Sequence, residues 1–145
     1  MATITSLLKA ATGNSQRGRN PYMVENTIDI VATTVDPSSA DVVQAITIPA
    51  GTKIMAAGVE VVESATMNTG TDATVTLGAA DPDEYVTAFD IDGAADGAYA
   101  PSATVAADVV LASADTLDLT FAGTGASFTA GKLRVYAVMM DVSSQ

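Results

Sequence analysis

Carboxylates are the side chains of this chain that could do chemistry, and they are concentrated in two short stretches near its middle. Asp81-Pro82-Asp83-Glu84 and the Asp- and Gly-rich stretch 90–97 place hard oxygen ligands on turn-forming sequence, as calcium requires. The candidates for a cation site or an acidic surface loop are Asp81, Asp83, Asp90, Asp92 and Asp96. Their spacing does not fit an EF-hand, which needs an oxygen-bearing side chain at position 94 and a Glu further on. Asp-Gly pairs also form ordinary turns, so we interpret these stretches as solvated acidic loops and assign no metal.

Other catalytic arrangements lack the residues they need. The chain has no His and no Cys, which removes the commonest general base and every thiolate site. Paired carboxylates can hydrolyse glycosides, but four Tyr, three Phe and no Trp offer few aromatic walls for a sugar. Lys53 and Lys132 stand beside turns, where a lysine is usually solvated. We therefore predict that the protein is not an enzyme and uses no cofactor.

The charge is divided unevenly along the chain. Residues 1–22 contain three of the six basic residues and none of the 17 acidic ones, so the remainder carries a net charge of −14. Such an acidic body repels phosphates, which argues against a nucleic-acid partner. No apolar run approaches the roughly 18–20 residues that span a bilayer, so we expect no membrane partner.

Residues 1–22 are predicted to form an N-terminal arm without a core of its own. Residues 7–11 could form a turn or two of helix, which is marginal in water unless a partner orders it. We therefore expect the arm to bind another protein through apolar anchors and basic residues. The arm residues assigned to this contact are Ile4, Leu7, Leu8, Lys9, Arg17 and Arg19.

From residue 23 to residue 145 the sequence has a period of two, which predicts β-strands. Strands are expected at 27–35, 42–48, 53–63, 73–77, 105–111, 115–121 and 132–142, with 85–91 either a strand or a short helix and 93–101 a surface loop. Seven to nine short strands with short connections predict an all-β, antiparallel β-sandwich. We prefer a jelly roll, because the long middle stretch 78–114 suits a crossing connection.

Two patterns predict which side chains face inward. In 53–63 the alternation places Met55, Ala57, Val59 and Val61 on one face. The last strand is apolar on both faces, so its second face lies either under another layer or at a subunit interface. Met139, Met140 and Met55 are either core residues or an adaptable contact surface.

Four segments together resemble a known class of proteins. They are Ile46-Thr47-Ile48-Pro49-Ala50-Gly51-Thr52-Lys53, Gly58-Val59-Glu60-Val61-Val62, Thr74-Val75-Thr76-Leu77-Gly78 with Asp81-Pro82-Asp83, and Gly131-Lys132-Leu133-Arg134-Val135-Tyr136-Ala137-Val138. Over most of residues 40–142 the chain resembles the head decoration, or cement, proteins of tailed bacteriophages of the marine and cyanobacterial type. The resemblance implies a β-sandwich or jelly-roll virion protein, a homotrimer on the outer capsid surface that is made in the host cytoplasm. It also implies the major capsid protein as partner, and no catalytic residues.

Two main functions remain open at this point, beside a physically similar third, a component of a cellular surface layer or shell. The first is a capsid decoration protein that bridges major capsid protein subunits and uses residues 1–22 to reach across them. The alternative is a fibre, tail or head-fibre module that binds host-surface glycans through the loop 79–101. The scarcity of aromatic residues favours the first, because ring stacking normally supplies much of the affinity for sugars.

Overall fold

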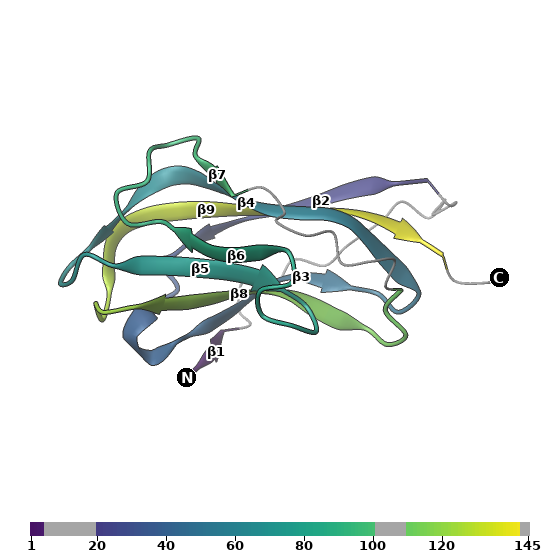
Figure 1. The fold of residues 1–145 in the computed structure, drawn as a ribbon, viewed down its shortest axis with the longest axis horizontal. Helices are drawn as coiled ribbons and strands as arrows, with labels where there is room; N and C mark the ends of the chain where they lie inside the picture. The colour runs from purple at the N-terminus through teal and green to yellow at the C-terminus, as the bar shows by residue number, and fades with distance from the viewer. Residues whose placement is uncertain (5–19, 101–109, 143–145) are drawn as a thin grey trace.

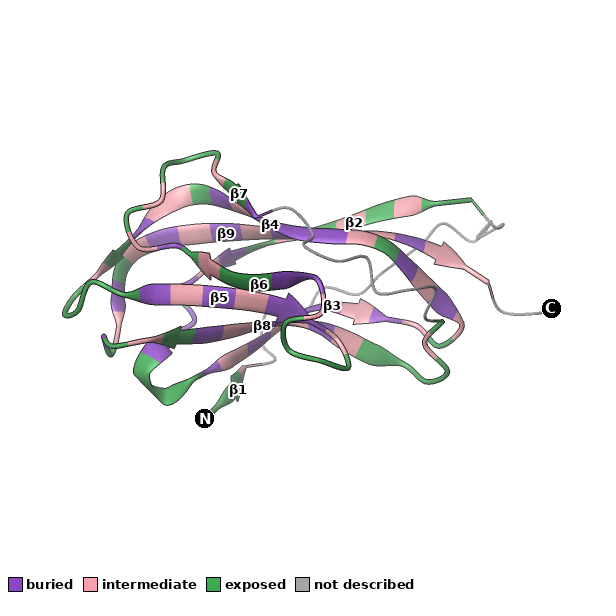
Figure 2. Ribbon diagram, in the orientation of Figure 1, coloured by how far each residue is buried: buried purple, intermediate pink, exposed green. Residues whose placement is uncertain are grey.

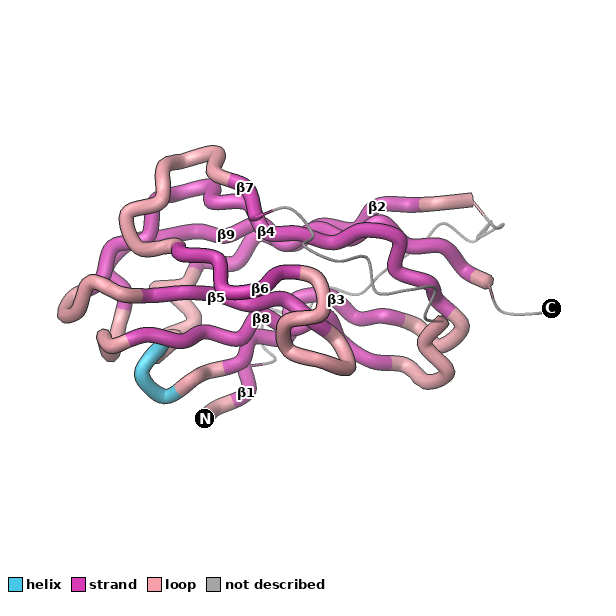
Figure 3. Tube along the Cα trace, viewed as in Figure 1, coloured by secondary structure: helices cyan, strands magenta, loops and turns pink. Residues whose placement is uncertain are grey.

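The structure is a computed structural model that describes residues 1–4, 20–100 and 110–142, and it consists of two β-sheets packed face to face (Figure 1). The predicted antiparallel β-sandwich is therefore confirmed. The strands are β1 (Thr3–Ile4), β2 (Tyr22–Asp29), β3 (Val42–Ile48), β4 (Thr52–Met67), β5 (Ala73–Gly78), β6 (Val86–Asp90), β7 (Tyr99–Ala100), β8 (Asp115–Gly123) and β9 (Phe128–Asp141). The described part also contains a short 3₁₀ helix, η1 (Pro37–Ser39), as Figure 3 shows. Within that part, no helix has the length and apolar character that a membrane crossing requires.

The two sheets have the strand orders β1-β3-β8-β5-β6 and β2-β9-β4-β7. Counted inward from the two ends of the chain after β1, the strands form four antiparallel pairs: β2 with β9, β3 with β8, β4 with β7, and β5 with β6. The pairs β4–β9 and β5–β8 complete the sheets. The short strand β1 pairs with β3 in the parallel direction.

Alternating side chains from both sheets form one hydrophobic core, which appears in Figure 2 as buried residues recurring along the strands. Leu117, Leu119 and Phe121 of β8 are 0% exposed, as their alternation predicts. Phe121 meets Phe128 edge to face, with ring centroids 6.2 Å apart. Since each fully buried side chain of this size contributes roughly 1.5–3 kcal/mol, this core is what holds the two sheets together.

In strand β4 one of the four residues predicted to face the core, Met55, faces outward instead. Ala57, Val59 and Val61 are buried as predicted, but Met55 is 37% exposed and Ile54 is buried in its place. The pairing with β9 shifts register between Ile54 and Ala56. A bulge of this kind inserts one residue and moves the preceding side chains to the opposite face, so simple alternation was wrong for Met55.

The strand predicted at 27–35 also differs from the structure. It begins at Tyr22 and ends at Asp29, where the Asp29 carboxylate accepts hydrogen bonds from the backbone N–H groups of Val31 (3.0 Å) and Ala32 (2.9 Å). This Asx-type turn competes with the sheet for the backbone and stops the strand. The chain then turns through residues 30–34, although Ile30 and Val35 remain buried in the core.

The middle of the chain contains two of the shorter strands. Residues 86–90 form strand β6, so the strand alternative for 85–91 is confirmed, and the predicted loop 93–101 contains the two-residue strand β7. The strand predicted at 105–111 lies mostly outside the described residues. At its end, Val110 forms an isolated bridge with Lys53, and Leu111 exchanges backbone hydrogen bonds with Gly51 and Thr52.

The final strand, β9, begins four residues before the predicted start and passes through Gly131. At Gly131 φ is +140°, and an added Cβ would lie 2.6 Å from Ile30 Cδ1. Both the backbone angle and the close contact therefore favour glycine at this position of β9. Leu133, Val135, Ala137 and Met139 are 0% exposed on the inner face. Tyr136, Val138 and Met140 on the other face are half-buried and lie on the outside of the four-stranded sheet.

Candidate interaction surface

The predicted acidic candidates do not form a metal site. Asp90 and Asp92 are joined locally, since the Asp90 carboxylate accepts a hydrogen bond from the Asp92 backbone N–H at 3.1 Å. Asp96 accepts one from the Ser64 backbone N–H at 2.7 Å and so ties its loop to β4. Asp81 and Asp83 are exposed in the β5–β6 turn. No group of three acidic, His or Cys side chains gathers anywhere in the described residues. The Asp90 and Asp96 carboxylates instead stabilise the backbone of their turn and loop.

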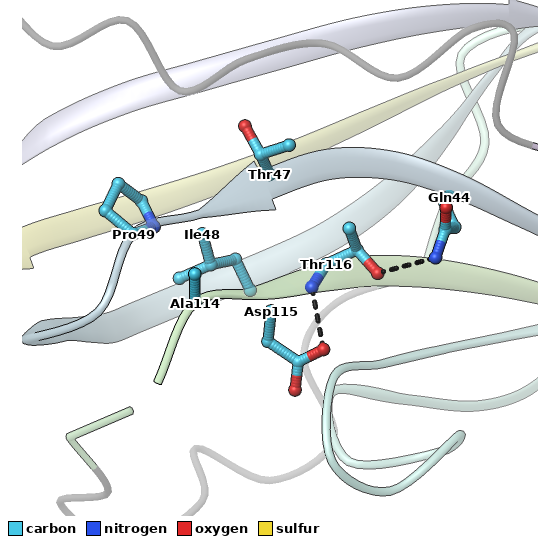
Figure 4. Close-up of a pocket in the computed structure, with 7 residues that line it drawn as sticks. All are labelled: Gln44, Thr47, Ile48, Pro49, Ala114, Asp115 and Thr116. Carbon is cyan, nitrogen blue, oxygen red and sulfur yellow. Dashed lines mark hydrogen bonds between the residues drawn. The ribbon is translucent and has the colours of Figure 1, made fainter. Parts of the chain in front are cut away.

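A depression of about 400 Å³ lies between the ends of β3 and β8 (Figure 4). Polar groups in it are already bonded to one another: Gln44 Nε2 donates to Thr116 Oγ1 at 3.3 Å, and the Thr116 backbone N–H donates to the Asp115 carboxylate at 2.8 Å. Its wall is completed by Thr47, Ile48, Pro49 and Ala114. Among the described lining residues Asp115 is the one charged side chain, and its carboxylate accepts the local hydrogen bond from Thr116.

The outer face of the four-stranded sheet carries a second depression, of about 330 Å³. Its lining comes from three strands and is called the tyrosine face here: Met23, Glu25, Tyr99, Arg134 and Tyr136. The register brings these residues together, because Tyr136 of β9 stands opposite Glu25 of β2 on one side and Gly58 of β4 on the other. Met23 is 63% exposed and Tyr99 is 55% exposed, so this is an apolar surface open to solvent.

The absence of a side chain at Gly58 positions Tyr136. A Cβ at Gly58 would lie 2.6 Å from the Tyr136 hydroxyl oxygen and 2.8 Å from Cζ, so the phenol ring lies flat over the glycine. Tyr99, on the neighbouring strand β7, meets this ring edge to face at a centroid separation of 6.2 Å. Two aromatic rings are thereby held on the outside of the sheet, where rings are well suited to contact another macromolecule.

An ionic cluster borders the two rings. Glu60 accepts from Arg134 Nε at 2.7 Å and pairs with Nη2 at 2.5 Å, while Glu25 lies 3.9 Å from Nη1. Two residues before Arg134 in β9, Lys132 Nζ forms an ion pair with the Glu63 carboxylate at 2.5 Å. Exposed ion pairs add little stability, so the consequence here is positional: the guanidinium is fixed beside the aromatic rings.

The charges in this cluster also affect titration. The hydrogen bond and negative charge of Glu60 raise the pKa of Arg134, and those of Glu63 raise the pKa of Lys132. Desolvation, followed by the hydrogen bond to Glu60, raises the pKa of Tyr99. All three groups therefore keep their neutral-pH protonation states, so the neutral Tyr99 phenol lies beside a paired cation.

Sequence reasoning did not find the tyrosine face. It grouped Met139, Met140 and Met55 as either core residues or a contact surface, and the structure separates them. Met139 is fully buried, Met55 is 37% exposed, and Met140 is half-buried on the outer face. The available signal was the second apolar face of β9, but its neighbours on β2 and β7 come from distant parts of the sequence.

Of the six arm residues assigned to the partner contact, Ile4 alone lies in the described part of the chain. Ile4 belongs to β1, is half-buried, and packs against the core beside β3. Leu7, Leu8, Lys9, Arg17 and Arg19 lie outside the described residues. The body that the arm joins begins with β2 at Tyr22.

Comparison with known proteins finds solved structures that share this fold. No protein-family model and no curated protein sequence matches this chain. A chain in the structure "Capsid of Ralstonia phage GP4" superposes with a TM-score of 0.67 at 16% identity, covering 98% of this chain and 99% of that one. A chain in "Acidic stable capsid structure of Helicobacter pylori bacteriophage KHP30" superposes with a TM-score of 0.50 at 19% identity, over 86% and 94% of the two chains. At these identities the likeness is one of fold.

Proposed function

We propose that this chain is a structural protein of a tailed-phage virion that decorates the outer capsid surface and stabilises it by bridging major capsid protein subunits. The observation that carries the proposal is the match, over nearly the whole length of both chains, to a chain in the Ralstonia phage GP4 capsid structure. A second match comes from another phage capsid. In this role the protein has no catalytic task and forms a homotrimer on the shell.

The physical properties of the body suit this role. A two-sheet sandwich with a continuous core is rigid, and the acidic composition keeps it soluble before it docks. The bound protein adds buried area across the seams between capsomers. Each contact can be modest, because many copies on one shell add up to a large resistance against the pressure of the packaged genome.

The contact with the major capsid protein is assigned to the arm. Leu7 and Leu8 provide the apolar anchors, and Lys9, Arg17 and Arg19 pair with acidic groups of the capsid, whereas Ile4 packs beside β3. An arm that orders on binding loses conformational entropy, which the newly buried area must offset. The tyrosine face offers the body a second contact, either with the shell or with a neighbouring copy.

Jelly-roll connectivity is part of the same proposal. The pairs β2–β9, β3–β8, β4–β7 and β5–β6 support it, because strands counted inward from the two ends of the chain meet each other in turn. A long hairpin wound around a barrel-like core produces this order, and it is an arrangement that viral capsid domains use.

The test is stoichiometric association with particles. We expect the chain to co-purify with assembled capsids at a fixed ratio to the major capsid protein, and to rebind capsids from which it has been stripped. In a matched variant, a Gly/Ser linker of equal length replaces residues 5–19, which keeps β1 and removes the arm's anchors and charges. Folded variant protein should fail to bind. Absence of the wild-type chain from particles would refute the proposed function, and full binding by the variant would remove the arm from the mechanism.

A further inference from the structure

Strand β1 is held on the sandwich by few contacts, all with a short segment that we call the Asp41 socket: Asp41, Val42 and Val43. Thr3 and Ile4 stand opposite Val42 and Val43 of β3 in parallel register. The Val42 backbone N–H donates to the Ala2 carbonyl at 2.8 Å, and the Ala2 backbone N–H donates to the Asp41 carboxylate at 3.0 Å. Three consecutive residues, 2–4, therefore supply the whole described contact.

The receiving side of this socket is built into the sandwich. Asp41 is only 5% exposed, and its second carboxylate oxygen accepts the Asp36 backbone N–H at 3.0 Å. Its carbonyl accepts the Phe121 backbone N–H of β8 at 2.9 Å. These bonds hold the carboxylate in place independently of β1, and residues 2–4 supply the remaining donor. Because a hydrogen bond to a charged carboxylate is stronger than one between neutral groups, the fixed Asp41 oxygen favours a segment that brings a backbone N–H to it.

The segment that fills the socket does not have to come from the same chain. Fifteen residues, 5–19, connect Ile4 to the described body, and such a length can reach up to about 50 Å when extended. Parallel pairing itself requires a long connection. Residues 2–4 of a second copy would make the same contacts, and exchange of an identical element between copies is a low-cost route to an oligomer.

Charge favours the exchange between copies. Each body carries a net charge of −14, so bodies packed side by side repel, whereas residues 1–22 carry three positive charges and no negative ones. A connection that crosses from one body to the next places those positive charges between two acidic surfaces. The exchange also converts a three-residue contact into a link between subunits.

We propose that β1 is exchanged: residues 2–4 of one copy dock on Asp41 and β3 of a neighbouring copy. This inference rests on the proposed self-association on the capsid, and it adds that each copy's socket is completed by its neighbour. The contacts of residues 2–4 then join one copy to the next.

Engineered cysteines provide the test, because the natural chain has none. Thr3→Cys and Val42→Cys occupy directly paired positions. The two single variants are mixed at high concentration or on capsids and then oxidised, and the products are resolved on non-reducing gels and by mass spectrometry. Exchange predicts a covalent heterodimer in the mixture and covalent oligomers from the double variant, while each single variant alone stays mainly uncrosslinked.

Two outcomes would overturn the inference. One is a double variant that closes only within its own chain, with no heterodimer in the mixture. The other is the absence of any disulfide between the two introduced cysteines, in variants whose circular dichroism and thermal unfolding match the wild type. Capsid binding is measured on the same samples, so that loss of exchange with retained binding leaves the proposed function intact. Exchange without capsid binding would instead refute the function.

Discussion

Replacing Gly58 with alanine tests whether the missing side chain is what holds Tyr136 against the sheet. The added Cβ would lie 2.6 Å from the Tyr136 hydroxyl, 2.8 Å from Cζ and 2.9 Å from Cε1. Since carbon atoms prefer about 3.5–4.0 Å, the ring must move by about 1 Å, and driving it off its rotamer costs about 0.5–1.5 kcal/mol. The same substitution in a strand without an obstructing ring would gain about 0.5–1 kcal/mol.

These opposing effects predict a coupling that a double-mutant cycle measures. Gly58→Ala should be close to neutral or slightly destabilising in the wild type and stabilising in a Tyr136→Ala background, with a coupling of about 1 kcal/mol. The assay is urea unfolding of all four proteins at equilibrium. Gly93→Ala is the control, because nothing lies within 4 Å of its added Cβ. Gly93 has a φ of +69°, so the substitution itself can cost stability. Its change in the free energy of unfolding should nevertheless add to that of Tyr136→Ala to within roughly 0.3–0.5 kcal/mol. An equal gain from Gly58→Ala in both backgrounds would refute the reasoning.

Three further predictions concern the core, a half-buried carboxylate and the arm. Leu119→Ala should lower the free energy of unfolding by about 2–5 kcal/mol in urea titrations, because Leu119 is 0% exposed between the sheets. Desolvation raises the pKa of Asp118, whose Oδ1 is buried without a hydrogen-bond partner. A raised acid pKa means that the native state is favoured while the group is protonated and loses stability as pH rises through the folded-state pKa. Asp118→Asn should therefore raise the melting temperature at pH 7, and the difference from wild type should shrink below about pH 4. Neutralising Lys9, Arg17 and Arg19 together should reduce capsid occupancy at low salt and flatten its salt dependence, as measured by co-sedimentation.

Matched controls separate these effects from general damage. Asp81→Asn removes an exposed carboxylate in the β5–β6 turn and should leave the melting temperature nearly unchanged at both pH values. A melting temperature that falls at pH 7 on Asp118→Asn would contradict the desolvation argument. Occupancy that is insensitive to salt in the wild type would contradict an electrostatic role for the arm.

The glycan-binding alternative has its own test, which is a glycan array with and without calcium. We expect no reproducible binding, because Tyr99 is the one exposed aromatic side chain in the described part of the loop 79–101. Binding that is abolished by substitutions in the acidic loop, such as Asp90→Asn with Asp92→Asn, would favour that alternative.

The strands and the core were largely predictable from the chain itself. A period of two identifies which residues face the core when a strand is regular, and for β8 that prediction holds at Leu117, Leu119 and Phe121. It fails at Met55, because a bulge depends on the partner strand and leaves no trace in local alternation. It also fails after Asp29, whose side chain stops the strand by capping the following turn.

By itself, the sequence determined the all-β class, the acidic body and the cationic segment, since these depend on composition and short-range periodicity. Only the tertiary structure decided which surfaces exist. The tyrosine face joins β2, β7 and β9 over a glycine of β4, and the Asp41 socket joins residues 2–4 to β3. The physical reason is that pairing between distant strands sets these neighbours, and the free energy of that pairing comes from burying both sheets at once rather than from any local segment.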